Sequence, residues 1–282
     1  MNDGQDIRFI AFLSIISLVI VWEYMQPKRH LSQNKSKRWF NNIALVALDG
    51  LIVRLLLPLG AAGVALWTEE QQIGLLHQVN LGHAANVVLA IILLDMIIYW
   101  QHRLFHVAPI LWRLHQVHHA DRDIDVSTGL RFHPVEILIS MLIKFSAVIL
   151  LGVPATAVIL FEVILNGMAM FNHGNIRLPK ALDSLLRLLV VTPDMHRVHH
   201  SILKHETNSN YGFNISIWDR VFGSYHAQPD MGHEHMTIGL EQHQNEPTHS
   251  ILWMLRLPFL STGGEYAKKN GINHKTKGEH HV

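Results

Sequence analysis

The stretch from Ala84 to His119 reads AANVVLAIILLDMIIYWQHRLFHVAPILWRLHQVHH. Its first half is an apolar run that ends near Trp100, close to the roughly 20 apolar residues that a transmembrane helix needs. Its second half carries five histidines in two short clusters. The stretch therefore predicts a membrane-spanning helix with a histidine-rich segment just beyond its end.

The composition of the whole chain agrees with a membrane protein. Of its 282 residues, 49% are hydrophobic and 16% are charged, whereas soluble domains carry about 25% charged residues. The formal net charge of +1 argues against a nucleic-acid-binding protein. There are 22 histidines and no cysteines, so thiolate chemistry is excluded while imidazole, the commonest metal ligand, is abundant.

Three further apolar segments predict membrane spans. They run from about Ile7 to Tyr24, from about Ile43 to Trp67 and from Val135 to Phe171. We interpret the first as a retained helix rather than a signal peptide, because it lacks a basic start and a small-residue cleavage site. The last segment, at roughly 37 residues, is too long for one span, and Gly152-Val153-Pro154 divides it into a helical hairpin. The predicted fold class is an all-α integral-membrane bundle of four to five spans with a cytosolic helical cap.

The distribution of Lys and Arg predicts the orientation. Basic residues gather in the loop after the first span, after the third span and after the hairpin, whereas the loop with Glu69 and Glu70 has none. The positive-inside rule then gives five crossings, an outside N-terminus and histidine clusters on the cytosolic side. The alternative is a shallow hairpin that enters and leaves on the inner face, which changes only the span count. A bacterial inner membrane is the expected location, or the endoplasmic reticulum in a eukaryote.

The chain divides into three predicted parts. Residues 1–83 hold the N-terminal transmembrane helices, residues 84–229 hold the histidine-rich domain, and residues 230–282 form a polar C-terminal tail. Within the tail, the apolar segment Ile251–Leu260 is a candidate for an anchor in the membrane interface.

Three histidine clusters carry the chemistry. His102 and His106 are four residues apart, which puts both on one face of a helix. The motif HxxHH occurs twice, and each copy presents three imidazoles on one helical face. One zinc takes about four ligands, so the eight imidazoles suit two metal ions better than one. The eight motif histidines are His102, His106, His115, His118, His119, His196, His199 and His200.

Two further histidines and several polar residues are candidates near this site. His173 lies at the end of the hairpin's second helix and is a candidate ligand. His133 precedes Pro134, so it is either a ligand or a helix cap. Carboxylates and amides often orient ligand imidazoles, and the candidates for that role are Asp95, Glu136, Asp194, Asn172 and Asn175.

Charged residues within the spans need partners. Lys144 and Glu162 are equally far from the hairpin turn, so we expect them to pair. Asp49 and Arg54 are candidates for a similar pair. The aromatic residues Tyr211, Phe213 and Trp218 follow the third cluster and either roof the site, touching the substrate, or pack as a cap on the metal-binding helices.

The ordered set of motifs resembles the fatty acid hydroxylase / sterol desaturase superfamily. The motifs are HRLFH at 102–106, HQVHH at 115–119, RFHPVE at 131–136, NHGN at 172–175, HRVHH at 196–200 and WDRVFG at 218–223. The resemblance implies a membrane-embedded non-haem di-iron oxygenase with two irons per chain. It also implies O2 as co-substrate, a separate electron-donor protein, and a lipid whose unactivated C–H bond is hydroxylated or desaturated. The lipid is left open: sterol-like, fatty acyl, isoprenoid, sphingoid or ether lipid.

Three other classes of function are alternatives to this oxygenase. A pterin-dependent ether-lipid monooxygenase of the same superfamily has similar motifs. A zinc-dependent membrane hydrolase is a further alternative, although the chain has no HExxH motif. A metal transporter or a bis-histidine haem protein fits less well, because a transporter places polar ligands inside several spans.

Overall fold

The computed structural model describes residues 3–79 and 81–260, which form helices and isolated β-bridges. The body is made of long helices: α1 (Asp3–Met25), α2 (Lys35–Leu56), α3 (Gly60–Gln71), α4 (His83–Val107), α6 (Pro134–Leu151) and α7 (Ala155–His173). A cap of short helices covers one end: α5 (Pro109–His119), α8 (Lys180–Leu186), α9 (Pro193–His199), α10 (Lys204–Thr207), α11 (Ile217–Val221), α12 (Gly232–His235) and α13 (Ile251–Arg256). The 3-10 helices are η1 (Leu75–Gln78), η2 (Thr128–Leu130), η3 (Glu241–His243) and η4 (Leu257–Phe259). The predicted all-α membrane bundle is confirmed.

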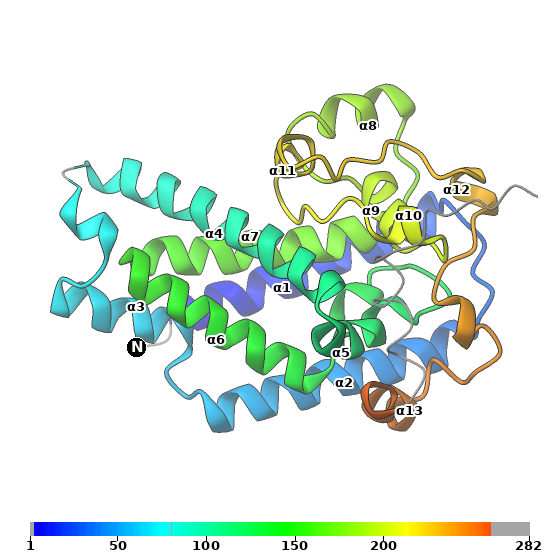
Figure 1. Cartoon of the computed structure of the whole chain (residues 1–282), viewed down its shortest axis with the longest axis horizontal. Coiled ribbons are helices and arrows are strands. Elements are labelled where there is room, and N and C mark those ends of the chain that lie inside the picture. The colour runs from blue at the N-terminus through cyan, green and yellow to red at the C-terminus, as the bar shows by residue number, and fades with distance from the viewer. Residues whose placement is uncertain (1–2, 80, 261–282) are drawn as a thin grey trace, which may run out of the picture.

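Five helical segments are long and apolar enough to cross a membrane. They are Asp6–Met25, Lys35–Gln78, His83–Val107, Pro134–Leu151 and Ala155–His173. Successive segments run in opposite directions along the body, with the N-terminus at the end away from the cap (Figure 1). This arrangement is compatible with five crossings, and the choice between five and four stays a prediction. Which membrane face carries the cap stays a prediction.

A helix break lies within the predicted second span. Helix α2 ends at Leu56, Leu57 has φ −131° and ψ 59°, and α3 begins only at Gly60. The cause is Pro58, which lacks an N–H and disfavours helical geometry in the residue before it. The segment from Ile43 to Trp67 is therefore two helices in sequence rather than one.

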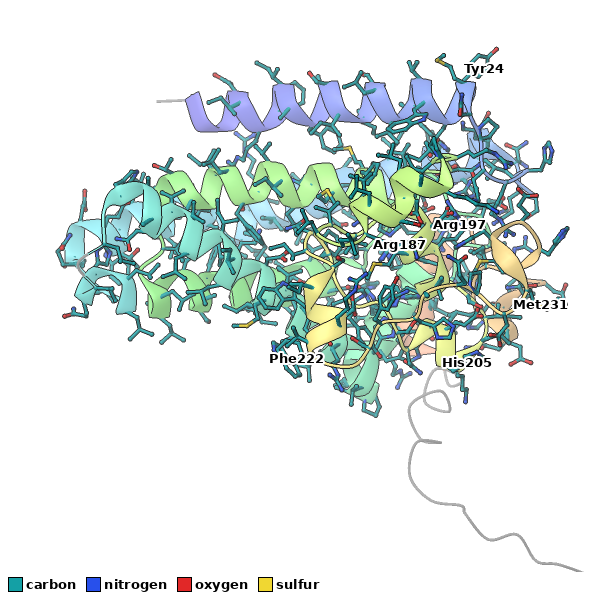
Figure 2. All side chains as sticks on the ribbon, turned by 90° about the horizontal axis from the view of Figure 1, so that it is seen from above. Tyr24, Arg187, Arg197, His205, Phe222 and Met231 are labelled. Atoms are coloured by element: carbon teal, nitrogen blue, oxygen red, sulfur yellow. The ribbon has the colours of Figure 1, made fainter. Side chains whose placement is uncertain are left out.

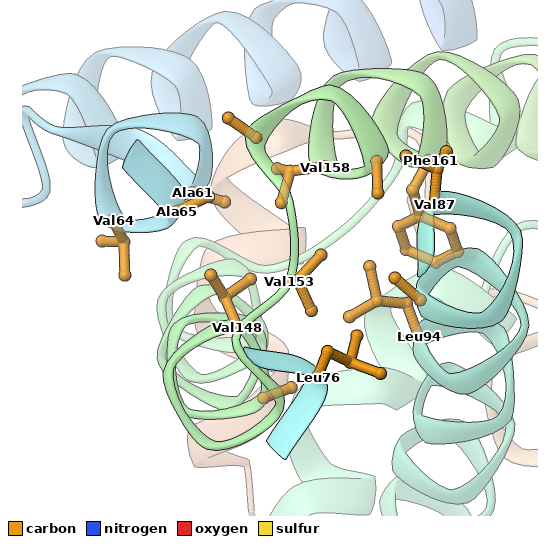
Figure 3. Close-up of a cluster of buried hydrophobic side chains, with 14 residues drawn as sticks. Ala61, Val64, Ala65, Leu76, Val87, Leu94, Val148, Val153, Val158 and Phe161 are labelled. Atoms are coloured by element: carbon orange, nitrogen blue, oxygen red, sulfur yellow. The ribbon is translucent and has the colours of Figure 1, made fainter. Parts of the chain in front are cut away.

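The predicted hairpin is confirmed, and it packs into the main apolar core. Gly152 ends α6 in a left-handed conformation with φ 65°, which glycine adopts without steric cost. Helices α6 and α7 meet α3 and α4 around a cluster that includes Val148, Val158 and Phe161 (Figure 3). Large apolar residues such as Leu142 and Leu150 are exposed on the outside of the bundle, as a lipid-facing surface requires.

The expected ion pair inside the hairpin is confirmed. Lys144 Nζ lies 3.1 Å from Glu162 Oε1, and Arg8 of α1 contacts the other carboxylate oxygen. Asp49 and Arg54 form no ion pair in the part of the chain that the structure describes. They are five residues apart on α2, so they point about 140° away from each other, which corrects the expectation that they pair.

Residues 230–260 pack against the rest of the cap and against α2. Met254 and Leu257 are fully buried in a cluster with Leu45 of α2 and with Trp112 and Val117 of α5. Leu252, on α13, and Phe259, in η4, are exposed instead. The C-terminal segment thus covers α5, while residues 261–282 of the predicted tail lie outside the described residues.

Candidate metal centre

Nine buried histidines gather into two groups where the bundle meets the cap. In each group, one ring nitrogen from every histidine lies within 4.8 Å of the corresponding nitrogen of the others. The first group consists of His102, His106, His115, His119 and His199. The second group consists of His118, His173, His196 and His200. All nine are the histidines that the sequence predicts as ligands, and each is at most 7% exposed.

The helices explain how the motifs are divided between the groups. Residues four apart on a helix lie only about 40° from each other around the axis, and residues three apart lie about 60° away on the other side. The i, i+4 pairs therefore stay together, as His102 with His106, His115 with His119, and His196 with His200. The remaining member of each HxxHH motif, His118 or His199, joins the opposite group. Each HxxHH motif thus divides its three imidazoles between the two groups, a division that the sequence did not predict.

The starts of helices α5 and α9 place their histidine rings at the end of the bundle that meets the cap. Helix α5 begins at Pro109, directly after α4 ends. Helix α9 begins at Pro193 after the N-cap Thr192, whose side chain accepts a hydrogen bond from the Met195 N–H. The Thr-Pro-Asp sequence therefore starts this helix, with Thr192 as the cap and Pro193 in the first helical position.

The second group brings nitrogen lone pairs face to face. His173 donates its Nδ1 proton to the Ala169 carbonyl at 2.6 Å, and His118 donates its Nδ1 proton to the Arg131 carbonyl at 3.2 Å. A neutral imidazole carries one N–H, so both Nε2 atoms are left with lone pairs. These two atoms are nevertheless 3.1 Å apart. Two buried lone pairs at that distance need a cation between or beside them.

The same contact pattern continues through the rest of the second group. His196 Nε2 lies 3.0 Å from His173 Nε2, and His200 Nε2 lies 3.3 Å from His196 Nε2. Four imidazoles without a carboxylate form a neutral donor set that fits a divalent metal with a coordination number of about four. The residues therefore fit a metal ion.

The first group is oriented by groups that accept its Nδ1 protons. His102 donates to the Tyr211 carbonyl at 2.8 Å, and His199 donates to the Ser209 carbonyl at 2.7 Å. His115 donates to Glu136 Oε1 at 2.6 Å. The Nε2 atoms of all three rings are buried without a hydrogen-bond partner. Fixing Nδ1 in this way leaves Nε2 free for a metal.

Four rings of the two groups outside the spans have a lowered pKa, which favours their uncharged form at neutral pH. Burial and neighbouring imidazoles lower the pKa of His118, His196 and His200 well below the usual value. Burial also lowers the pKa of His199 to about 3. An imidazole must be deprotonated at the ligating nitrogen to bind a metal, so these shifts favour metal binding.

Among the five predicted orienting residues, Glu136 accepts a hydrogen bond from an imidazole. Asp95 acts indirectly, by holding the loop that orients His102. Asp95 Oδ2 accepts hydrogen bonds from Trp218 Nε1 at 2.8 Å and from the Ile215 N–H at 3.1 Å. It thus fixes the segment from Tyr211 to Trp218, whose first carbonyl orients His102. The expectation that Asp95 holds an imidazole directly is corrected, because its carboxylate accepts hydrogen bonds from the cap loop instead.

The other three predicted orienting residues hold the backbone around the site. Asn172 Nδ2 donates to the Phe213 carbonyl at 2.6 Å. Asn175 Nδ2 donates to the Arg29 carbonyl at 2.8 Å, and Asp194 pairs with Arg197 and with Lys28. These contacts tie α7 and α9 to the cap and to the chain after α1, rather than to the rings.

His133 joins neither histidine group. Its Nδ1 accepts a hydrogen bond from the Val135 N–H at 3.2 Å, so it is the N-cap of α6. Its Nε2 lies 3.4 Å from the Leu255 carbonyl. Of the two roles that the sequence allowed, ligand or helix cap, the structure shows the cap.

The aromatic residues after α9 border the first group. The Tyr211 ring centre lies 5.1 Å from that of His106 and 5.8 Å from those of His102 and His199. Phe213 is 6.5 Å from His102 and from His196, and so lies beside both groups. Trp218 donates to Asp95 and belongs to the packed cap.

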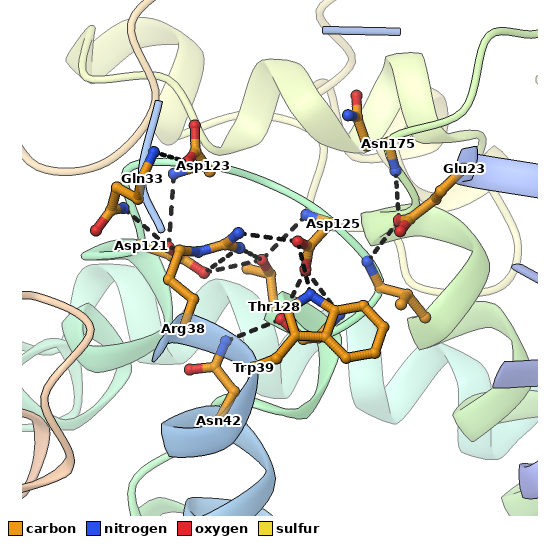
Figure 4. A network of polar contacts seen from close by, with 12 residues as sticks. Glu23, Gln33, Arg38, Trp39, Asn42, Asp121, Asp123, Asp125, Thr128 and Asn175 are labelled. Atoms are coloured by element: carbon orange, nitrogen blue, oxygen red, sulfur yellow. Dashed lines mark hydrogen bonds and ion pairs between the residues drawn. The ribbon is translucent and has the colours of Figure 1, made fainter. Parts of the chain in front are cut away.

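A buried ionic network that the sequence did not predict holds the loop between the second cluster and α6. Arg38 of α2 is fully buried and donates to Asp121 and Asp125 at 2.8–2.9 Å (Figure 4). Trp39 Nε1 also donates to Asp125, and Glu23 of α1 accepts from the Val126 N–H. The alternating acids of the sequence DRDID, which begins two residues after His119, were the available signal.

Comparison with known proteins identifies the class. Residues 87–224, which contain all nine grouped histidines, match the family model described as fatty acid hydroxylase. The part of the chain that carries the histidines is therefore similar to the fatty acid hydroxylase family, a metal-dependent class of membrane oxidoreductases, as its motifs indicate.

Individual relatives fall within the same superfamily. Ornithine lipid hydroxylase OlsE of Rhizobium tropici is 27% identical over 225 residues, which cover 78% of this chain and 67% of that protein. Alkylglycerol monooxygenase of Danio rerio is 37% identical over 143 residues, which cover 50% of this chain and 31% of that protein. Lathosterol oxidase of Mus musculus is 27% identical over 141 residues, which cover 50% of this chain and 44% of that protein. The chain thus spans less than half the length of the latter two relatives, and no solved structure matches it significantly.

Proposed function

We propose that the chain is a membrane-bound di-iron oxygenase that hydroxylates an unactivated C–H bond of a lipid, with O2 as co-substrate. The proposal includes one iron in each histidine group, electrons from a separate donor protein, and a site on the cytosolic side of a bacterial inner membrane. Desaturation of the same lipid is the other outcome of the same C–H chemistry.

The observation that carries the proposal is the pair of all-histidine groups. Five and four buried imidazoles converge without a carboxylate among them, and several face each other through lone pairs. Two metals in neutral sites keep their full positive charge and can supply redox chemistry with O2. This donor set supports an oxygenase over a zinc hydrolase, which uses fewer histidines and an open carboxylate base.

The chain's own residues hold and orient the ligands. Tyr211, Ser209 and Arg131 present backbone carbonyls that fix the Nδ1 protons of His102, His199 and His118. Glu136 does the same for His115 and adds negative charge beside one ligand. Burial of every ring excludes bulk water from the reacting centre, which limits side reactions of a strong oxidant.

A groove in the lipid-facing surface supports a lipid substrate. It lies between α4 and α6, has a volume of about 430 Å³, and is lined by apolar residues such as Ile97 and Leu142. Ile139, another lining residue, is one helical turn from Glu136, and Ile97 is five residues before His102. One end of an acyl or isoprenoid chain in this groove would therefore lie one to two helical turns from His102 and from Glu136.

The relatives narrow the substrate class. Ornithine lipid hydroxylase matches over most of this chain, which supports hydroxylation of a membrane lipid. A second candidate is cleavage of an ether lipid with a reduced pterin, supported by the higher identity to alkylglycerol monooxygenase over the histidine region.

The experiment is expression of the chain in a bacterial host under ¹⁸O2, followed by mass spectrometry of the lipids. We expect a lipid that gains one labelled oxygen with the unchanged chain and with His30→Ala, which alters an exposed histidine outside both groups. The product should be absent with His106→Ala and with His200→Ala.

Other outcomes identify the alternatives. A lipid that loses two hydrogens and gains no label indicates desaturation. Consumption of an added alkylglycerol only when reduced pterin is supplied supports the ether-lipid reaction. A lipid profile that is the same with the unchanged chain and with both variants contradicts the proposed oxygenase.

A further inference from the structure

A third group of metal-binding side chains lies outside the two histidine groups. It consists of His205 and Glu206 of α10, His226 after α11 and Asp230 before α12. One ligand atom from each residue lies within 4.8 Å of the other three. His205 is at the outer surface of the cap, on the side that carries Met231 (Figure 2). His205 and Asp230 are thus exposed, Glu206 is buried, and none of the four residues belongs to either histidine group.

Short contacts hold the four residues together. His205 Nε2 lies 3.0 Å from Asp230 Oδ2, and the Asp230 N–H donates to Glu206 Oε1 at 2.6 Å. The ring centres of His205 and His226 are 5.7 Å apart. A tetrahedral zinc with ligands at about 2.0–2.2 Å holds them about 3.3–3.5 Å from one another, so small side-chain movements bring these atoms into place.

Glu206 supplies an independent sign of a cation. Its side chain is fully buried, and its Oε2 has no hydrogen-bond partner. A buried carboxylate oxygen without a partner is energetically costly, because the charge is removed from water and nothing replaces the lost hydration. A metal bound at the group would provide that partner.

We propose that His205, Glu206, His226 and Asp230 bind one zinc ion that is separate from the iron centre. Two carboxylates balance the charge of a divalent cation. Two imidazole nitrogens favour zinc over magnesium or calcium, which prefer oxygen ligands. Zinc at this place joins α10 to the segment from Phe222 to Met231.

The position of the site gives the zinc a structural effect. Residues 208–210 follow α10, and the Ser209 carbonyl orients His199 of the first histidine group. Asn210 Nδ2 donates to the carbonyls of His226 and Met195 at 2.8 and 2.9 Å. The zinc therefore stabilises residues 208–210, whose backbone orients His199, without contacting the iron ligands.

The test measures bound zinc on full-length protein in detergent. The iron centre is loaded with iron first, zinc is then added, and unbound metal is removed. The main variant is His205→Ala/Asp230→Ala, since both side chains are 56% exposed and their removal leaves the interior intact. His235→Ala, on the exposed end of α12, is the matched control.

We expect about one zinc per chain in the unchanged protein and in the control, and none in the double variant, with equal iron content in all three. The zinc X-ray absorption spectrum should fit mixed nitrogen and oxygen ligands. A second variant, Glu206→Gln, keeps an acceptor for the Asp230 N–H and should weaken zinc binding at least tenfold. Zinc that is retained equally in the double variant, zinc with nitrogen ligands alone, or no zinc in the unchanged protein overturns the proposal.

Discussion

At the end of the bundle away from the cap, α3, α4, α6 and α7 meet through aliphatic side chains and Phe161, with one ionic group around Glu162. At the cap end, nine imidazoles and the Arg38 network are buried instead. The first arrangement tolerates any apolar side chains of suitable volume. The second depends on particular hydrogen bonds and, in our account, on metal ions.

This difference separates stability from metal binding. A change at the far end should loosen the bundle and leave the metal sites occupied, because the apolar cluster of Figure 3 and the two histidine groups share no residue. A change at the cap end should reduce both stability and metal content, because the same polar contacts position the ligands.

The largest effect on stability is expected from Arg38→Ala. The change leaves the buried carboxylates of Asp121 and Asp125 without their cation, and breaking one partner of such a pair costs about 3–5 kcal/mol. Because Asp121 is two residues after His119, metal content should fall as well. Thermal unfolding and metal analysis check both parts, and normal metal content in a destabilised variant would separate this network from the site.

Phe161→Ala tests the apolar end of the bundle by the same two measurements, thermal unfolding and metal content. Removal of this buried ring leaves a cavity and should destabilise the bundle by about 3 kcal/mol. Metal content per folded chain should stay at the level of the unchanged protein. Loss of metal in this variant would show that packing at the far end and metal binding at the cap end are coupled.

The ionic group around Glu162 should show unequal effects. Glu162→Leu leaves Arg8 and Lys144 without their shared anion, and one unpaired charge within a span costs about 2.5–3.5 kcal/mol. Lys144→Leu should cost less, because Arg8 still neutralises Glu162. A Lys144→Leu/Glu162→Leu double variant should be more stable than Glu162→Leu alone, because only Arg8 is then left unpaired. A double variant that is no more stable than Glu162→Leu would rule out the pairing.

The smallest effect is expected from Glu136→Gln. The amide oxygen can still accept the Nδ1 proton of His115, but the negative charge beside that ligand is lost. Metal affinity should fall about tenfold, at the low end of the range for partners of ligand histidines. A competition titration with a chelator measures the change. Glu136→Ala should fall further, and equal affinity in both variants would mean that the hydrogen bond contributes nothing.

Much of the fold and of the ligand set could be predicted from the sequence because both rest on local rules. Apolar length gave the spans, and Gly152 with Pro154 gave the hairpin turn. Spacing of four residues gave the histidine pairs that stay together. His173 could be found because it ends a span beside polar neighbours, which need partners in a buried position.

Other features depend on contacts between distant segments and could not be predicted. The division of each HxxHH motif between two groups depends on how α5 and α9 face each other. Four of the five Nδ1 partners are backbone carbonyls, which no residue type encodes. Asp95 accepts hydrogen bonds from Ile215 and Trp218, which lie more than 100 residues later in the chain, rather than from a ring. Arg38 pairs with acids about 85 positions later in the chain, so its burial could not be seen locally.

The most direct test of the central claim is the iron content of His106→Ala, His200→Ala and the double variant, compared with the unchanged chain and His30→Ala. If each histidine group holds one metal, the unchanged chain and His30→Ala should bind about two irons, each single variant about one, and the double variant none. About one iron per chain in the unchanged protein, lost equally in both single variants, would contradict two separate sites.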